Sequence, residues 1–315
     1  MKPAGRAEAR IYGMRDEIQE KDIRKVSAFR GKRMPFLLCG RRIYRMTVKD
    51  FFRQTPRAAA AFSGGTDSAL LLYLAKQNGC DVHAYYVKTA FQPEFELEDA
   101  RRLAGELDIP MTVVEPDILA VPEAAANGTD RCYHCKRAIF TALQKAARGD
   151  GYTVLLDGTN ASDDAGDRPG MRALRELGVR SPLRECGITK MEVRRLSRKA
   201  GLFTWAKPAY ACLATRIPTG TAIRADRLRA VEQAETQMRE MGFLDFRVRI
   251  YGDAARIQVR AEQLALAVEK REEILERLGS LFDGVFLDLN VRAGSPDMEW
   301  HTENDQQEEG TDHEQ

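Results

Sequence analysis

The 315-residue sequence lacks any apolar run that could cross a membrane, because no stretch approaches the roughly 18 consecutive apolar residues that a spanning helix needs. Its first residues, Met1–Arg6, also lack the apolar core of a secretory signal. There are six cysteines, and two of them stand as Cys132-Tyr133-His134-Cys135, which suits metal or redox chemistry in a reducing compartment better than a disulfide framework. We therefore expect a cytoplasmic protein with no membrane contact and no structural disulfides.

Charge is distributed unevenly along the chain, although the formal net charge is only +2. Residues 1–45 hold 13 Lys and Arg against 5 Asp and Glu, whereas residues 293–315 hold 8 acidic residues and no Lys or Arg. Both ends lack sustained apolar periodicity, so we expect a mobile basic extension over 1–45 and a disordered acidic tail over 293–315. Contact between the basic extension and RNA is the alternative, but solvated charge is the favoured interpretation and we expect no nucleic-acid partner.

Between residues 46 and 292, short runs rich in β-branched residues alternate with amphipathic stretches, which indicates an α/β fold with a parallel sheet and helices on both faces. The rhythm changes near Thr219-Gly220-Thr221, so we expect the α/β domain to cover 46–220 and a small α+β domain to cover 221–292. The predicted strands of the first domain are Ala58–Phe62, Val82–Val87, Met111–Val114 and Thr153–Leu156, and its predicted helices are Asp67–Gln77, Glu94–Leu107 and Arg137–Ala147. For the second domain we predict a helix over Asp226–Met241, two strands joined at Tyr251-Gly252-Asp253, a helix over Ala261–Leu278 and a strand over Val285–Leu289.

A glycine-rich loop, Ser63-Gly64-Gly65-Thr66-Asp67-Ser68, stands between a predicted strand and a predicted helix. Glycines let the backbone approach a phosphate closely, and the amides at a helix N-terminus carry partial positive charge. A Walker loop is excluded, because it needs a lysine for the outer phosphates where this sequence has Asp67. The loop therefore predicts an anion site, with the hydroxyls of Ser63, Thr66 and Ser68 as further donors and Asp67 as a ligand of Mg²⁺. A glycine turn capped by serine or aspartate is the alternative.

A second polar segment, Asp157-Gly158-Thr159-Asn160, follows the predicted strand that ends at Leu156. Ligands of open α/β sheets bind at the carboxyl edge of the strands. The segment continues through Asp163-Asp164 to Asp167-Arg168-Pro169-Gly170, which carries more charge than a simple connection needs. We expect Asp157–Asn160 to help bind the nucleotide, with a solvated surface turn as the alternative.

Together these motifs resemble those of the LarE-type ATP-dependent sulfur transferases, a family of the PP-loop superfamily that serves the synthesis of the nickel-pincer nucleotide. The resemblance implies that the Ser63–Ser68 loop holds pyrophosphate and that ATP is cleaved between its α and β phosphates. It also implies that the substrate is a small nucleotide, a pyridinium dicarboxylate mononucleotide, whose carboxylates are adenylated and then converted to thiocarboxylates. The resemblance covers about residues 46–292, and its further carriers are Ser181-Pro182-Leu183-Arg184-Glu185, Lys207-Pro208-Ala209-Tyr210-Ala211-Cys212-Leu213-Ala214-Thr215-Arg216 and Phe246-Arg247-Val248-Arg249.

The resemblance also assigns roles to three arginines. Arg216, Arg247 and Arg249 match family positions that bind substrate phosphate or carboxylate, and a guanidinium fork suits both groups. Arg216 joins Asp67 and Cys212 as an expected catalytic residue. Because Arg247 and Arg249 are two residues apart, they share one strand face, which could equally be a solvated surface.

Three cysteines, Cys132, Cys135 and Cys212, form the expected metal site. Four would complete a closed zinc site, whereas three on a cubane cluster leave one iron without a protein thiolate. The resemblance agrees, because one branch of the family consumes a single cysteine at the position of Cys212, while the branch with the added Cys-x-x-Cys resembles a 4Fe-4S enzyme. The expected cofactors are therefore ATP, Mg²⁺ and a 4Fe-4S cluster. Zinc held by the three thiolates with His134 or another ligand, and a thiol redox pair, are the alternatives.

Some features leave the function open in part. Glu235 matches an acid of the family's small domain, but Gln258 stands where a glutamate is common, and residues 1–45 have no counterpart. We expect sulfide or a sulfur-donor protein as a partner, and a homo-oligomer. The rival functions are a tRNA thiolase, an ammonia-using synthetase and a nucleotide-regulated iron-sulfur carrier. The thiolase is disfavoured because the sequence has no zinc-ribbon pair and, apart from the basic extension, no recognisable RNA-binding module.

Overall fold

The computed structural model describes residues 46–163 and 169–293. The predicted basic extension and the acidic tail beyond Ala293 lie outside these residues, as do Asp164 and Asp167-Arg168. Among the residues that are described, no helix is both long enough and apolar enough to span a membrane.

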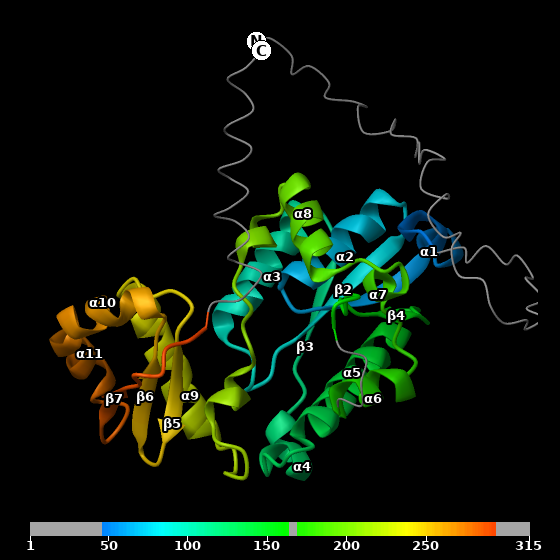
Figure 1. Cartoon of the computed structure of the whole chain (residues 1–315). Helices are drawn as coiled ribbons and strands as arrows, with labels where there is room; N and C mark the ends of the chain where they lie inside the picture. Colours follow the sequence, from blue (N-terminus) through cyan, green and yellow to red (C-terminus); the bar gives the residue numbers. More distant parts are fainter. Residues whose placement is uncertain (1–45, 164–168, 294–315) are drawn as a thin grey trace, which may run out of the picture. The chain divides into compact units, whose positions relative to one another are not determined.

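Four parallel strands form the first sheet in the order β3-β2-β1-β4 (Figure 1). The register places Ala60 of β1 between Ala84 of β2 and Leu156 of β4. The strands fall where the sequence predicts them, although β4 keeps only the last two residues of its predicted range. The α/β prediction is thus confirmed, with bounds β1 Arg57–Phe62, β2 Asp81–Val87, β3 Met111–Val114 and β4 Leu155–Leu156.

Side chains of β1 alternate between the two faces of this sheet, and each face is covered by helices. Ala58, Ala60 and Phe62 share one core cluster with residues of α1, α2 and α3. Ala59 packs on the other face, in a cluster with Leu143 and Ala147 of α5. Because successive side chains of a strand point to opposite faces, an apolar strand such as β1 needs a helical layer on each side. These helices are α1 Val48–Gln54, α2 Thr66–Gln77, α3 Glu94–Glu106 and α5 Arg131–Gly149.

Helix α5 begins earlier than predicted, at Arg131 instead of Arg137. Its first residues include His134 and two cysteines, which have low helix propensity, and the predicted range therefore began only at Arg137. The earlier start places Cys132 and Cys135 within the helix itself.

Several short helices that the sequence did not predict connect β3 to α5 and β4 to the second sheet. The longest, α8, is Lys190–Lys199, and the side chains of Thr189 and Glu192 form a capping box at its start. The others are η2 Ile118–Ala120, α4 Pro122–Ala125, α6 Pro169–Glu176, α7 Pro182–Glu185, η3 Phe203–Ala206 and η4 Leu213–Arg216.

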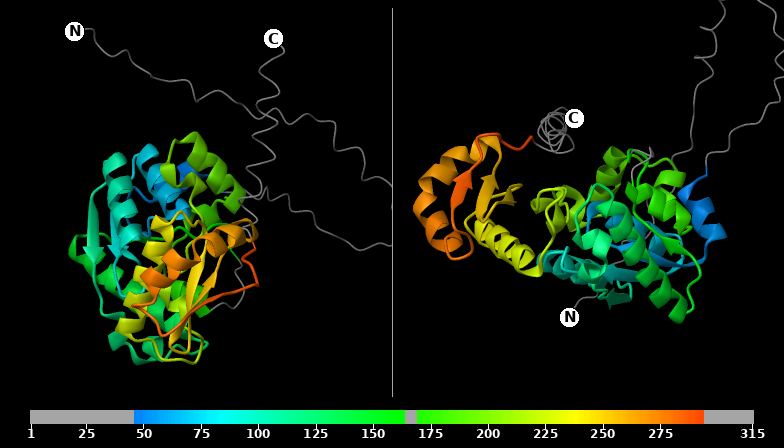
Figure 2. Two further views of the ribbon diagram at one scale, coloured as in Figure 1. Left: turned by 90° about the vertical axis from the view of Figure 1, so that its left-hand side faces the viewer. Right: turned by 90° about the horizontal axis from the view of Figure 1, so that it is seen from below.

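A second, three-stranded sheet has the order β5-β6-β7, with β5 antiparallel and β7 parallel to β6. Helices α9 and α11 lie beside it (Figure 2) and contribute to its core. The predicted single helix over Ala261–Leu278 is wrong: Lys270, at φ −88° and ψ 14°, leaves the helical conformation and separates α10 from α11. The bounds are α9 Ala225–Glu240, β5 Arg247–Tyr251, β6 Ala254–Gln258, η5 Ala261–Gln263, α10 Leu264–Glu269, α11 Arg271–Leu278 and β7 Val285–Leu287.

The core beneath the second sheet extends across the predicted domain boundary. Val231 and Val248 belong to the same buried cluster as Phe91 and Leu213, which come from before Thr219-Gly220-Thr221. The division of the chain at residue 220 therefore remains a prediction.

Candidate active site

The glycine-rich loop connects β1 directly to α2 and packs beneath α3. Gly64 has φ +72°, and a Cβ at this position would lie 2.9 Å from the carbonyl oxygen of Glu96, so glycine is required there. Gly65 is the N-cap of α2 and no side chain caps the helix. The alternative interpretation, a glycine turn with a serine or aspartate cap, is therefore not what the structure shows. The first amides of α2 have no side-chain cap, as an anion site at a helix N-terminus requires.

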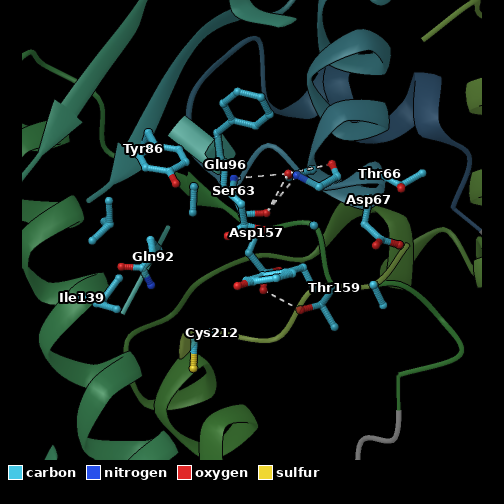
Figure 3. Close-up of a pocket in the computed structure, with 18 of the residues that line it drawn as sticks. Ser63, Thr66, Asp67, Tyr86, Gln92, Glu96, Ile139, Asp157, Thr159 and Cys212 are labelled. Carbon is cyan, nitrogen blue, oxygen red and sulfur yellow. Dashed lines mark hydrogen bonds between the residues drawn. The ribbon is translucent and has the colours of Figure 1, made fainter. Parts of the chain in front are cut away.

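A cavity of about 490 Å³ opens at the carboxyl edge of the first sheet (Figure 3). Apolar side chains of α5 form one wall, and the segment from Lys207 to Cys212 forms another. Ligand-sized cavities that combine an apolar wall with a few convergent polar groups are the usual binding sites of enzymes. The predicted site residues that line the cavity are Ser63, Gly65, Thr66, Asp67, Ser68, Asp157, Gly158, Thr159 and Cys212.

The predicted magnesium ligand, Asp67, is already engaged by two side chains. Its Oδ2 lies 2.5 Å from Nζ of Lys190, and its Oδ1 accepts a hydrogen bond of 3.1 Å from Nδ2 of Asn160. Lys190 also lines the cavity, so a cation that the loop itself lacks is supplied by α8. No local motif marks this lysine, because it lies 123 residues from Asp67 along the chain.

The Asp157–Asn160 segment packs directly against the glycine-rich loop. A Cβ on Gly158 would lie 2.8 Å from the backbone nitrogen of Ser68, so the two segments are in close backbone contact. Asp157 is buried and accepts hydrogen bonds of 2.5 Å from the hydroxyls of Ser181 and Thr159. The segment is therefore part of the cavity wall and not a solvated surface turn.

The three hydroxyl groups of the glycine-rich loop make hydrogen bonds within the protein. Oγ1 of Thr66 donates to the carbonyl oxygen of Thr204 at 2.8 Å, and Oγ of Ser63 and Ser68 lie 3.1 Å apart. Thr66 therefore links the loop to the segment that leads to Lys207, while the two serines face each other across the loop.

The three predicted metal-binding thiols come from two segments that meet beside the cavity. Cys132 is exposed, whereas Cys135 and Cys212 are half-buried. Burial raises the pKa of Cys135 to about 12, and the nearby thiols of Cys212 and Cys132 add to the rise. Burial likewise raises the pKa of Cys212, against the opposing charge of Arg131. Cys135 and Cys212 pack against the same core cluster, although within residues 46–163 and 169–293 no three His, Cys, Asp or Glu side chains converge as a metal site.

Comparison with known proteins gives the family of this fold and cavity. The family model for asparagine synthase matches residues 41–261. A pyridinium-3,5-bisthiocarboxylic acid mononucleotide synthase from Lactiplantibacillus plantarum is 32% identical over 252 residues, which are 79% of this chain and 91% of that enzyme. The chain belongs to the LarE family. An uncharacterized protein from Synechocystis is 39% identical over 226 residues, 70% of this chain and 83% of that protein.

Membership of the LarE family makes the chain an ATP-dependent sulfurtransferase with a PP-loop. A tRNA-specific 2-thiouridylase from Clostridium botulinum is more distant, with 26% identity over 181 residues that cover 47% of this chain and 51% of that enzyme. This shorter match gives less support to the rival thiolase function than the match along most of the LarE-family chain.

The three arginines that the LarE resemblance singles out do not line the cavity among the described residues. Arg216 is 1% exposed and is paired with Glu235, and its Nη1 also donates to the carbonyl oxygen of Ala211. Arg247 is buried and donates to the carbonyl oxygen of Ala209 at 2.8 Å, and Arg249 donates to that of Thr215 at 2.8 Å. Each therefore contacts the Lys207–Arg216 segment, and their roles as substrate ligands remain predictions.

Glu96 is a cavity residue of this LarE-family protein that the sequence did not single out. Its carboxyl group lies on α3 above the glycine-rich loop, and burial raises its pKa to about 7. Lys207, which is paired with Asp99 at 2.7 Å, opposes this rise. A half-buried carboxyl group whose pKa is near neutrality is typical of functional sites, but no local motif distinguishes Glu96 from the other acids of α3.

Proposed function

We propose that the protein adenylates a carboxylate of a pyridinium dicarboxylate mononucleotide and replaces one carboxylate oxygen with sulfur. The observation that carries this proposal is that the glycine-rich loop and Cys212 line the same cavity. The relative from Lactiplantibacillus plantarum is named as a synthase of a pyridinium bisthiocarboxylic acid mononucleotide. A loop that suits pyrophosphate and a sulfur-bearing side chain in one cavity match the two steps that such a product requires.

The first step makes a carboxylate oxygen into a leaving group. A carboxylate oxygen attacks the α-phosphorus of ATP, the bond from that phosphorus to the bridging oxygen breaks, and pyrophosphate leaves. Uncapped amides at the start of α2, together with the ammonium of Lys190 in the cavity lining, support the binding of pyrophosphate there. In the second step a sulfur nucleophile attacks the acyl carbon and AMP leaves. Catalysis of both steps is mostly positioning and charge stabilisation.

Mg²⁺ fits the oxygen donors of this site. Asp67, Asp157 and Asp163 all line the cavity, and hard cations prefer carboxylate oxygens, although these three side chains do not converge on one centre among the described residues. Because Oδ2 of Asp67 is paired with Lys190, metal binding at this oxygen requires the lysine to move away from it. When bound, Mg²⁺ would neutralise charge on the polyphosphate of ATP.

Analysis of the products of ATP tests the first step. Incubation with ATP, Mg²⁺ and the dicarboxylate nucleotide should give AMP and pyrophosphate, which phosphorus NMR separates from ADP and orthophosphate. Asp67→Asn should nearly abolish the reaction, whereas Asp283→Asn, at an exposed position, should not. ADP and orthophosphate as products would reject the proposed function.

The proposed sulfur site consists of Cys132, Cys135 and Cys212, which would hold a 4Fe-4S cluster and leave one iron without a protein thiolate. Three soft thiols beside an apolar wall suit such a cluster in their chemistry, although their side chains do not already converge on one centre within the described residues. When bound, the cluster would supply sulfide to the activated acyl group.

Metal analysis and mass spectrometry separate this site from its alternatives. Protein reconstituted without oxygen should contain iron and acid-labile sulfide, and replacement of any of the three cysteines by alanine should remove them. Uptake of zinc alone would support the zinc alternative. Loss of sulfur from Cys212 after one turnover, seen as dehydroalanine, would show that the residue is a consumed donor.

A further inference from the structure

The segment that carries Cys212 is tied to the chain before α5 by a buried amide. Asn127 is 1% exposed and has φ +56°. Its Nδ2 donates to the carbonyl oxygens of Pro218 at 2.9 Å and Thr221 at 3.0 Å. Its own carbonyl oxygen accepts a hydrogen bond of 2.9 Å from the amide of Gly220. One side chain and its backbone thus fix the chain that runs from Pro218 to Thr221.

Arg131, the first residue of α5, completes this connection. Its Nη1 donates to Oδ1 of Asn127 at 2.7 Å and to the carbonyl oxygen of Ala214 at 2.9 Å. Its Nη2 lies 3.8 Å from Sγ of Cys132. The guanidinium therefore contacts the thiol of Cys132 directly. It also holds the backbone two residues beyond Cys212, which carries a second thiol of the proposed site.

Other contacts of the same segment do not replace these side chains. The amide of Leu213 donates to the carbonyl oxygen of Phe91 at 2.9 Å, and that of Ile223 donates to Ala125 at 2.7 Å. The first contact holds the Cys212 segment against the chain that precedes α3. The second holds the chain after this segment against α4, which precedes α5. Apolar packing joins the same two segments, because Cys135 and Cys212 lie against one core cluster. Among the described residues, the side-chain hydrogen bonds from the Cys212 turn to the start of α5 come from Arg131, which Asn127 orients.

We propose that Asn127 and Arg131 are positioning residues of the sulfur site, which hold the backbone next to Cys212 against the end of α5 that carries Cys132 and Cys135 before any metal or cluster is bound. This inference rests on the proposed sulfur site and goes beyond it, since it assigns the approach of the two cysteine-bearing segments to the protein and leaves only the final side-chain rotation to the metal. These hydrogen bonds of Asn127 and Arg131, called the clasp below, order the Cys212 segment in advance. They therefore reduce the loss of conformational entropy that would otherwise accompany metal binding.

Cadmium binding to the reduced protein without cluster tests the clasp. Thiolate-to-cadmium charge transfer in the ultraviolet increases with the number of bound thiolates, so the experiment counts ligands without measuring enzyme activity. Asn127→Gly removes the carboxamide, and glycine adopts a positive φ at no cost. Arg131→Gln removes the guanidinium, Arg131→Lys keeps a cation, and Arg137→Gln is the matched control, an exposed arginine of the same helix.

We expect the wild type and Arg137→Gln to show the band of three thiolates. Asn127→Gly and Arg131→Gln should bind Cd²⁺ about tenfold more weakly, as expected for the loss of a buried hydrogen bond. Their charge-transfer band should have the intensity of two bound thiolates, as in Cys212→Ala. Arg131→Lys should recover part of the difference. Unchanged ATP binding by calorimetry would show that the variants are folded. If Asn127→Gly does not fold, the variants of Arg131 still test the proposal, because Arg131 is only half-buried.

Two results would overturn the inference in different ways. If Asn127→Gly and Arg131→Gln bind Cd²⁺ through three thiolates as tightly as the wild type, the clasp has no positioning role while the sulfur site stands. If the wild type itself shows no three-thiolate band, the sulfur site is wrong, and the clasp has nothing to position.

Discussion

Arg216 and Glu235 form a buried ion pair in which Nε of the arginine lies 2.6 Å from Oε1 of the glutamate. Their side chains are only 1% and 2% exposed. Each carboxylate oxygen of Glu235 accepts a further hydrogen bond, one from the amide of Val248 at 3.0 Å and the other from the hydroxyl of Tyr210 at 2.5 Å. The pair therefore connects the Cys212 loop to α9 and β5, and Glu235 is used in holding the protein together.

Replacement of one partner of this pair should destabilise the protein strongly. Glu235→Gln leaves the guanidinium of Arg216 buried without a counter-charge, which should lower the free energy of unfolding by about 3 kcal/mol or more in urea titrations. The double variant Arg216→Met/Glu235→Leu should recover much of the loss, because no buried charge remains. Asp226→Asn, which breaks the exposed pair with Arg224, should cause no measurable change. A Glu235→Gln protein as stable as the wild type would contradict this role.

Glu96 should make stability depend on pH near neutrality. Burial raises its pKa from 4.5 to about 7, so between these values the folded protein holds a proton that the unfolded chain releases. Stability from this group is therefore complete below pH 4.5 and is lost as the pH rises through 7. Glu96→Gln stays neutral, and should be more stable than the wild type at pH 8 by up to about 3 kcal/mol, with the difference vanishing near pH 4.5.

Urea titrations of both proteins at several pH values measure this difference. Glu98→Gln, at an exposed position of the same helix, is the control and should follow the wild type at every pH. A difference between Glu96→Gln and the wild type that does not change with pH would show that the carboxyl group titrates normally.

The close contact at Gly158 should make this position intolerant of a side chain. Gly158→Ala places a methyl group 2.8 Å from the backbone nitrogen of Ser68, so the Asp157–Asn160 segment must move away from α2. We expect ATP affinity, measured by calorimetry, to fall by about tenfold or more. A change of this size corresponds to the loss of one or two hydrogen bonds to the nucleotide. Gly105→Ala on α3, where a Cβ meets no atom within 4 Å, should bind ATP normally. Equal ATP affinity of both variants would show that the segment does not shape the nucleotide site.

Arg249 should act on the nucleotide substrate and not on ATP. Its side chain lies across the β5–β6 pair from Arg256, and burial together with the charge of Arg216 lowers its pKa. Arg249→Ala should raise the KM of the substrate about tenfold with little change in the KM of ATP, as expected for the loss of one charge-assisted hydrogen bond. Arg256→Ala, an exposed arginine in register with it, is the control. A rise in the KM of ATP alone would reject the assignment.

Local sequence was enough to predict the glycine-rich loop and the sheet around it. The apolar run of Ala58–Phe62, the glycines of Ser63–Ser68 and the apolar run that follows them in α2 are each encoded within a few neighbouring residues. The break at Lys270 was missed because no proline or glycine marks it, and the two halves of that stretch carry the same apolar periodicity.

The partners of the site residues could not be predicted in the same way. Lys190 meets Asp67 and Arg131 meets Ala214 only after folding, across 123 and 83 residues of chain. Neither lysine nor arginine is unusual on a helix surface, so nothing in their own neighbourhoods separates them from solvated charges. The role of Arg216 is ambiguous for the same reason, because a guanidinium suits a substrate carboxylate as well as it suits Glu235.

The shared cavity determines how a substrate with two reactive ends must be processed. One cavity among the described residues brings the glycine-rich loop and Cys212 together, so only one carboxylate of a dicarboxylate nucleotide can lie at the phosphorus and the sulfur at a time. Under the proposed function, a mixed anhydride formed there lies in the same cavity as Cys212. The second end can react only after the half-finished nucleotide turns round or dissociates and rebinds, so under the proposed function a monothiocarboxylate should rise and then fall during the reaction.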